Sequence, residues 1–223
     1  LGLYALEEHF DKILIESNKH REGVILKFNE DTPTGEIINS LGIAGETNTE
    51  VNSILQEYGL PYKFDKEIIK MANNVKEKIL IKEIEKRKDF RKKMTVTIDP
   101  KDAKDFDDAI SFEKNKDNNF EIGIHIADVT HYVKPNTIID EEAKNRGNST
   151  YLVDRVIPML PEKLSNNICS LRPNENKLCF SFIVEINKKG KIIKKRFEKT
   201  IIKSNYRFSY EEVQEIIENR TRK

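Results

Sequence analysis

Short apolar, β-branched runs separated by polar turns recur at the start of the chain. Strands are predicted over residues 12–16, 23–28 and 35–38, and a short apolar pair at Leu41-Gly42 follows them. Three or four short strands are too few for an independent sheet domain. Residues 1–42 therefore indicate the end of a small β-barrel whose beginning is missing.

The spacing of apolar residues changes to a helical period after this segment. Apolar side chains recur at this spacing from Val51 to Tyr58, and Gly59 is expected to end the helix. Asp65 could cap a second helix. Residues 75–84 are rich in lysine and glutamate and predict a third helix with a solvated charged face. We therefore expect residues 43–94 to form a helical segment.

Strand patterns dominate again from residue 95 to the end of the chain, residue 223. The isoleucines of Phe120–Ile126 alternate with Gly123 and His125, as expected for a strand whose two faces differ. A final helix is predicted over residues 210–218. The other predicted strands cover residues 94–98, 109–113, 178–186 and 192–202. This mixture predicts an α+β fold, in which a partial barrel precedes a mixed α/β domain.

Composition excludes several classes of protein. The 223 residues carry 39 Lys and Arg against 38 Asp and Glu, so overall charge gives no attraction to nucleic acid and RNA binding would need local clusters. No apolar run approaches the ~20 residues of a membrane helix, and no secretion signal is present. Two cysteines, Cys169 and Cys179, are too few for a disulfide scaffold. We therefore expect a cytoplasmic protein with no membrane association.

An acidic loop carries the candidate chemistry. Five aspartates lie within residues 99–108, directly after a predicted strand. Carboxylates this close repel one another unless cations neutralise them, and Mg²⁺ prefers oxygen ligands. Two such ions could assist displacement at a phosphodiester. An exposed acidic turn neutralised by Lys101 and Lys104 is an alternative, whereas an EF-hand is disfavoured because the loop has no glycine.

Five ordered sequence blocks resemble the ribonuclease II/ribonuclease R family of exoribonucleases, with a closer likeness to ribonuclease R. They are Thr97-Ile98-Asp99-Pro100 with Asp105-Phe106-Asp107-Asp108-Ala109, His125-Ile126-Ala127-Asp128-Val129 with His131-Tyr132-Val133, Arg146-Gly147-Asn148-Ser149-Thr150-Tyr151-Leu152, Ile157-Pro158-Met159-Leu160-Pro161 with Leu164-Ser165, and Cys169-Ser170-Leu171. Ser204 to Val213 fits a later family pattern.

The resemblance implies a domain organisation and an activity. Residues 1–42 would be the C-terminal part of a cold-shock, OB-type domain, residues 43–94 a helical entry segment, and residues 95–223 the N-terminal part of a truncated catalytic domain. Family members hydrolyse single-stranded RNA from its 3′ end with Mg²⁺ and release nucleoside 5′-monophosphates. They also use a glutamate and an arginine far downstream, so this chain alone is expected to be weak or inactive.

The resemblance also implies roles for individual residues. Asp99, Asp105, Asp107 and Asp108 match the four catalytic, metal-binding aspartates, with Asp99 and Asp108 as first candidates for direct ligands. Asp105 would support the metal site, and Asp107 would hold a second ion or position water. Tyr151 matches the tyrosine that packs against the 3′-terminal nucleotide, and a stacked ring is tolerant of base identity.

Three arginines have two possible roles, whereas one further aspartate and two histidines are interpreted as structural or exposed residues. Arg155, Arg172 and Arg207 could bind phosphates or form ion pairs within the fold. Asp102 is interpreted as an exposed loop carboxylate, and His125 and His131 as structural histidines.

Several functional points stay open from sequence. Mn²⁺ could replace Mg²⁺, since both accept oxygen ligands. Single-stranded RNA is the expected partner, with ribosomes or RNA-decay factors as further candidates and no prediction of oligomeric state. The alternative function is an RNA-binding module with a non-catalytic acidic loop.

Overall fold

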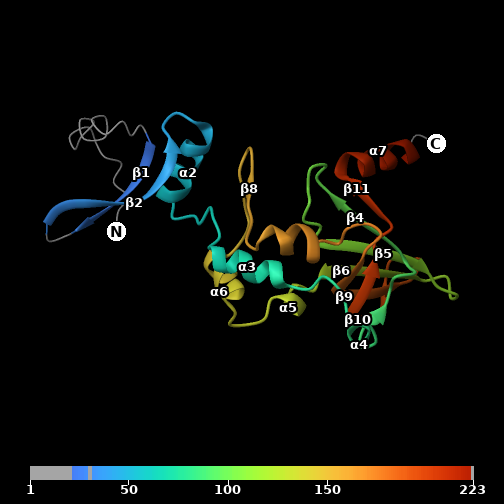
Figure 1. Cartoon of the computed structure of the whole chain (residues 1–223). Coiled ribbons are helices and arrows are strands. Elements are labelled where there is room, and N and C mark those ends of the chain that lie inside the picture. Colours follow the sequence, from blue (N-terminus) through green and yellow to red (C-terminus); the bar gives the residue numbers. More distant parts are fainter. Residues whose placement is uncertain (1–21, 30–31, 222–223) are drawn as a thin grey trace. The chain divides into compact units, whose positions relative to one another are not determined.

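The computed structural model describes residues 22–29 and 32–221, and these divide into two compact units between Phe64 and Asp65 (Figure 1). The predicted strand at residues 12–16 lies outside the described residues. Within the described part, no helix is both long and apolar enough to cross a membrane. The α+β fold class predicted from the sequence is confirmed, while the domain boundaries expected after residues 42 and 94 stay predictions.

The first unit contains an antiparallel hairpin, β1 (Glu22–Asn29) and β2 (Thr32–Ile43), followed by helix α2 (Thr47–Glu57). The buried Leu55 anchors this helix. Gly42 has φ of +126°, and a Cβ at this position would lie 2.5 Å from the Thr49 hydroxyl oxygen. A side chain would therefore collide where β2 meets α2, which explains the glycine.

The second unit is built on one seven-stranded sheet. Its order is β11 (Tyr206–Ser209), β4 (Met94–Asp99), β5 (Asp108–Lys114), β6 (Phe120–Ala127), β9 (Asn176–Ile186), β10 (Ile192–Lys203) and β3 (Lys88–Asp89). The terminal pairs β11–β4 and β10–β3 are parallel, and the other neighbours are antiparallel.

Helices and one small hairpin complete this unit. α3 (Lys66–Asn74) lies against α6 (Ile138–Arg146) and against the π-helix η1 (Lys163–Ile168). α6 begins at Thr137, whose hydroxyl accepts from the Asp140 amide at 3.3 Å. The remaining elements are α4 (Ile81–Ile84), α5 (Val129–Tyr132), α7 (Tyr210–Thr221), β7 (Thr150–Tyr151) and β8 (Val156–Ile157).

The two faces of the sheet differ in an unusual way. Cross-strand partners Ile110, Ile124, Phe182 and Phe197 share one face, which is largely exposed at Ile110, Ile124 and Phe197. The opposite face is buried and carries small polar side chains with a histidine. Its fully buried members include Thr95, Thr97, Ser111, His125, Ser181 and Thr200. Four of these residues, Ser111, His125, Ser181 and Thr200, are hydrogen-bonded to one another.

The helix predicted over residues 75–84 is wrong apart from its last turn, α4. Val75 is extended, with φ of −65° and ψ of 123°. The Glu77 carboxylate accepts from Lys163 and from the Asn167 amide, so it forms long-range rather than helical pairs. Leu80 and Ile81 are both exposed, so neither contributes to a buried helix face. Because they are adjacent in sequence, they could not lie on the same face of a helix.

Candidate active site

The aspartate loop, residues 99–108, connects two neighbouring strands. Asp99 is the last residue of β4 and Asp108 the first of β5. These strands pair from Met94–Phe112 to Val96–Ile110 and then separate. The loop therefore lies beyond the end of the β4–β5 pairing, and it brings residues from both strand ends to one place.

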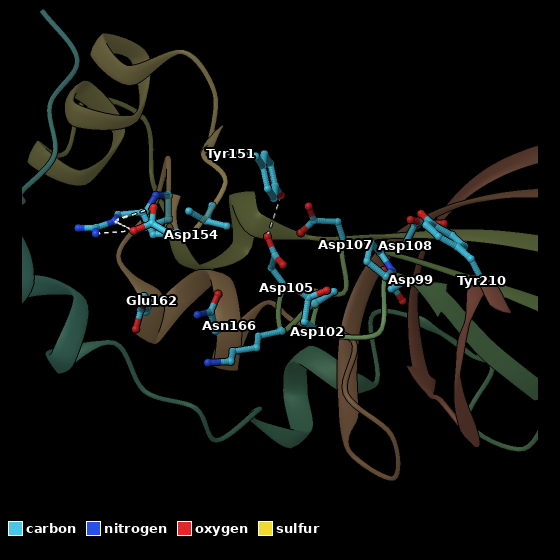
Figure 2. A pocket seen from close by; sticks show the side chains of 16 residues that line it. Asp99, Asp102, Asp105, Asp107, Asp108, Tyr151, Asp154, Glu162, Asn166 and Tyr210 are labelled. Carbon is cyan, nitrogen blue, oxygen red and sulfur yellow. Dashed lines mark hydrogen bonds and ion pairs between the residues drawn. The ribbon is translucent and has the colours of Figure 1, made fainter. Parts of the chain in front are cut away.

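All five residues assigned from the sequence line one cavity of about 700 Å³ (Figure 2). Asp102 is exposed, as expected for a loop carboxylate, and lines the same cavity. The lining residues are Asp99, Pro100, Asp102, Ala103, Lys104, Asp105, Asp107, Asp108, Tyr151, Asp154, Arg155, Val156, Pro158, Glu162, Asn166 and Tyr210.

Asp99 is the buried member of the group. The residue is only 8% exposed. The Oδ2 atom of its side chain is buried and has no hydrogen-bond partner among the described residues. Burial, followed by the negative charge of Asp108, raises the pKa of Asp99, and the Thr97 hydroxyl and then the Arg207 guanidinium oppose this shift. An unsatisfied buried carboxylate oxygen is costly unless a cation or a polar ligand meets it.

Asp107 opens into the cavity but titrates abnormally. The protein around the carboxylate removes part of its hydration, and Asp105, Asp108 and Asp99 add negative charge. Together these effects raise the pKa of Asp107 to about 6. A cluster of carboxylates that repel one another in this way is stabilised by a bound cation, because the positive charge reduces the repulsion.

A small hairpin brings Tyr151 to the loop. β7 and β8 pair, and the Leu152 amide donates to the Arg155 carbonyl at 2.8 Å. The buried Arg146 anchors the base of the hairpin by donating to Glu142 and to the Pro158 carbonyl at 3.2 Å. These bonds hold the tyrosine beside the aspartate loop.

Tyr151 points toward Asp105 (Figure 2), and its hydroxyl donates to Asp105 Oδ2 at 3.2 Å. Partial burial and the negative charge of Asp105 raise the pKa of the phenol. The residue is 67% exposed, so most of its ring is open to a ligand.

The donor set fits a hard divalent cation. Among the described residues, no Lys, Arg or His forms an ion pair with any of the four aspartates. Within the same part of the chain, no three His, Cys, Asp or Glu side chains converge closely enough to form a complete metal cage. Mg²⁺ takes one or two carboxylates and fills its other positions with water and phosphate, so a complete protein cage is not required.

The structure gives partners within the fold to the three arginines whose roles the sequence left open. Arg155 pairs with the adjacent Asp154 at 2.6 Å, and Arg172 contacts Asn167 and Glu175. Arg207 donates to the carbonyls of loop residues Pro100 and Lys101. At least part of each guanidinium is therefore engaged within the fold.

Both histidines have partners within the fold, in agreement with their structural interpretation. His125 is fully buried, with Nδ1 2.7 Å from the Ser181 hydroxyl and Nε2 2.9 Å from the Ser111 hydroxyl. His131 lies 3.6 Å from Glu83. Cys169 and Cys179 are free and buried.

Sequence reasoning missed five cavity residues: Asp154, Val156, Glu162, Asn166 and Tyr210. Asn166 lies on η1, and π-helical turns are frequent at functional sites, but no sequence pattern marks such a turn. Tyr210 follows β11, whose Ser209 pairs with Asp99. That pairing joins residues 110 positions apart, so local spacing gives no signal for it.

Residues 87–223 match the RNB domain family, and residues 9–65 match the cold shock domain family. Ribonuclease R of Thermotoga maritima is 42% identical over 189 residues, which cover 84% of this chain and 27% of that protein. The chain therefore spans about a quarter of this curated relative's length.

Solved structures agree with these matches. Mycoplasma genitalium RNase R in complex with ribose-methylated single-stranded RNA superposes with a TM-score of 0.81 at 28% identity, covering 90% of this chain and 32% of that one. Yeast Ssd1, described as a pseudonuclease, shares the fold with a TM-score of 0.71 at 18% identity, over 94% of this chain and 27% of its own. Because the RNB match covers residues 87–223, more than half of the sequence, the chain belongs to the RNB domain family, and it is similar to ribonuclease R within that match.

Proposed function

We propose that this chain supplies the metal-binding part of a 3′-to-5′ exoribonuclease that hydrolyses single-stranded RNA to nucleoside 5′-monophosphates. One observation carries the proposal: Asp99, Asp105, Asp107 and Asp108 line a single cavity together with Tyr151. This arrangement combines oxygen ligands for cations with an aromatic surface for a nucleotide. Family membership and the RNA-bound Mycoplasma structure support the substrate class.

Mg²⁺ is the proposed cofactor, and Mn²⁺ is an alternative because both accept carboxylate oxygens. The ion, when bound, stabilises negative charge on phosphate oxygens and increases the acidity of a coordinated water. Asp99 offers a buried oxygen that lacks a protein partner, and Asp108 lies at the start of the neighbouring strand. We assign these two residues as direct ligands, Asp105 as support of the site, and Asp107 as a ligand of a second ion or an orienting group for water.

Tyr151 is proposed to hold the 3′-terminal nucleotide. Its exposed ring can stack on any base, which suits an enzyme that removes nucleotides without regard to sequence. Asn166 and Arg155 line the same cavity and offer polar groups to the sugar-phosphate backbone. Cytoplasmic location and association with ribosomes or RNA-decay factors stay predictions.

A second candidate is an RNA-binding module with a non-catalytic acidic loop. The fold alone does not exclude it, since Ssd1 shares the architecture. The four aspartates favour hydrolysis, because a loop that only supports RNA binding has no need of closely spaced carboxylates that repel phosphate.

The test is hydrolysis of 5′-labelled single-stranded RNA in Mg²⁺, with the products separated by size and by chromatography of the mononucleotides. It compares the longest polypeptide encoded by the gene, the same polypeptide with Asp107→Asn, and the 223-residue chain alone. Asp117→Asn, an exposed aspartate on the β5–β6 turn, is the matched control.

We expect shortening from the 3′ end with release of 5′-monophosphates, a loss of about 10²-fold or more in Asp107→Asn, and no change in Asp117→Asn. The 223-residue chain alone is expected to be weak or inactive. RNA binding that is equal in EDTA and Mg²⁺, with no mononucleotide from any form, would favour the binding module.

A further inference from the structure

Repulsion between the carboxylates of the aspartate loop opposes the loop conformation that brings them together. The five aspartates within residues 99–108 repel one another when ionised, and the loop between β4 and β5 contains no helix or strand of its own. When no cation is bound, this repulsion would move the carboxylates apart unless the loop backbone is held in place. The carboxylates can share one cavity only if the loop backbone is held from outside.

Ser170 holds the middle of the loop. Its residue is completely buried, and its hydroxyl donates to the Lys104 carbonyl at 2.8 Å while accepting from the Phe106 amide at 3.1 Å. These two groups belong to the residues on either side of Asp105. The next amide, that of Leu171, donates to the Phe106 carbonyl at 2.8 Å. One buried segment therefore fixes the backbone on both sides of this carboxylate.

Arg207 holds the first part of the loop. β11 runs parallel to β4, with Arg207 opposite Thr97, so the guanidinium reaches past the end of β4. Its Nη2 donates to the Pro100 carbonyl at 2.7 Å and to the Lys101 carbonyl. The guanidinium carbon also lies 5.3 Å from the centre of the Phe106 ring. Arg207 therefore connects the backbone after Asp99 to the residue after Asp105.

Neither Ser170 nor Arg207 is among the described residues that line the cavity. The hydrogen bonds of Ser170 Oγ and of Arg207 Nη2 are made with loop backbone, so these atoms act on the shape of the loop. Ala127 makes a comparable contact from the other side, where its amide donates to the Asp107 carbonyl at 2.9 Å. That contact is made by the backbone and survives most substitutions, whereas the Ser170 and Arg207 contacts depend on side chains.

We propose that Ser170 and Arg207 are positioning residues that hold the aspartate loop in its metal-binding arrangement before any cation binds. The catalytic consequence rests on the proposed function, but the mechanical claim does not. Loop rigidity can be measured in the metal-free chain, without RNA and without turnover.

The first experiment is hydrogen–deuterium exchange of the metal-free 223-residue chain, read on peptides that cover residues 99–108. In Ser170→Ala we expect exchange across residues 104–107 to be about 10-fold faster or more, because the Phe106 amide loses its acceptor. Ser204→Ala is the matched control, since Ser204 is also buried and hydrogen-bonded to strand backbone. It should leave loop exchange unchanged. Unchanged loop exchange in folded Ser170→Ala would overturn the role of Ser170.

Arg207 is tested separately, so that a folding failure of one variant leaves the proposal testable. Arg207→Ala should accelerate exchange of residues 100–106, and Arg207→Lys should restore part of the protection because lysine keeps a charged donor. Arg196→Lys, whose guanidinium pairs with Glu121 and Glu198 elsewhere on the sheet, is the control. Equal loop exchange in Arg207→Ala and wild type would overturn the role of Arg207.

The second experiment measures RNA hydrolysis by the longest encoded polypeptide with the same substitutions. We expect Ser170→Ala and Arg207→Ala to lower kcat about 10–100-fold, the size of effect produced by small displacements of reacting groups. KM for RNA should stay within about twofold, and Arg207→Lys should recover part of kcat. Faster loop exchange with undiminished kcat would overturn the catalytic consequence. Faster loop exchange in the two variants, combined with a wild-type protein that never cleaves RNA, would support the positioning role and overturn the proposed function.

Discussion

Asp107 combines a proposed catalytic role with a charge that opposes folding. Its folded-state pKa of about 6 exceeds the ordinary value of 3.8, so the ionised form destabilises the folded chain above pH 6. This penalty disappears as the pH falls through 6 toward 3.8. A site that must gather negative charge therefore lowers the stability of the protein that holds it.

Asp107→Asn is predicted to stabilise the metal-free chain at pH 7.5 by about 1 kcal/mol, a value reduced for solvent screening of an exposed group. The gain should vanish near pH 4, where wild-type Asp107 is protonated. Chemical denaturation at both pH values measures it. Added Mg²⁺ should raise wild-type stability more than that of the variant, and equal stabilisation by Mg²⁺ in both would contradict a metal role for Asp107.

Substitutions of Tyr151 can separate the contribution of its ring to RNA binding from that of its hydroxyl. If the ring stacks on the terminal base, Tyr151→Ala should weaken single-stranded RNA binding about 10-fold, whereas Tyr151→Phe should bind nearly as wild type. Fluorescence anisotropy in an Asp107→Asn background measures affinity without hydrolysis. Tyr206→Ala, an exposed tyrosine on β11 that does not line the cavity, is the control. Equal weakening by the Phe variant would instead indicate that the hydroxyl carries the effect.

At the scale of elements, four strands of the sheet are joined by a buried chain of hydrogen bonds. Ser111 on β5 contacts His125 on β6, which contacts Ser181 on β9, and Ser181 lies 2.6 Å from Thr200 on β10. Gly123 makes room for it, since a Cβ there would lie 2.5 Å from the Ser111 hydroxyl and 2.6 Å from His125 Nε2. Phe90 covers the imidazole edge-on, with ring centres 5.3 Å apart.

This network predicts a stability loss in acid. Burial, with a smaller contribution from Lys93, lowers the pKa of His125 from 6.5 to about 4. The unfolded chain therefore takes up the proton first, and stability present above pH 6.5 is lost as the pH falls toward 4, by about 3 kcal/mol at most. Because Asp107 acts in the opposite direction over part of this range, the informative quantity is the difference between wild type and His125→Gln in denaturant titrations. A difference that does not change between pH 7 and pH 4 would contradict the assignment.

Local patterns predicted most of these elements but not their long-range pairing. The strands β4, β5, β6, β9 and β10 follow runs of β-branched residues, and α2 and α3 follow apolar residues at helical spacing. Residues 75–84 carry the composition of a helix, yet Glu77 is held by Lys163 and Asn167 from distant sequence. Tertiary contacts of this kind override local propensity.

In the candidate site, too, local sequence predicted some residues, whereas others reach the cavity only through long-range contacts. Four of its aspartates lie within the ten residues 99–108, so one loop and a family pattern were enough to find them. Tyr210 and Asn166 reach the cavity through the parallel β11–β4 pairing and the π-helix, which no local spacing encodes. Ser170 was visible only as part of a sequence block, because its role depends on the two backbone groups it meets.

At the scale of the second unit, one face of the sheet carries several exposed aromatic and aliphatic side chains. Phe112 is 51% exposed, Phe180 49% and Phe197 66%, and Phe197 stacks on both Phe180 and Phe182. Ile124 and Ile126 fill the space between these aromatic residues and are also exposed. Contiguous apolar patches of this kind are typical of surfaces that become covered by other polypeptide.

We therefore predict that the 223-residue chain self-associates as its concentration rises, and that Phe112→Lys combined with Phe197→Lys shifts it toward the monomer. Light scattering coupled to size-exclusion chromatography measures the mass directly. Val153→Lys is the matched control, because Val153 is fully exposed on the β7–β8 hairpin and lies outside this face. A wild-type chain that stays monomeric at all concentrations would mean that the exposed phenylalanines do not form an adhesive surface. Association that persists in the double variant would place the contact on another part of the chain.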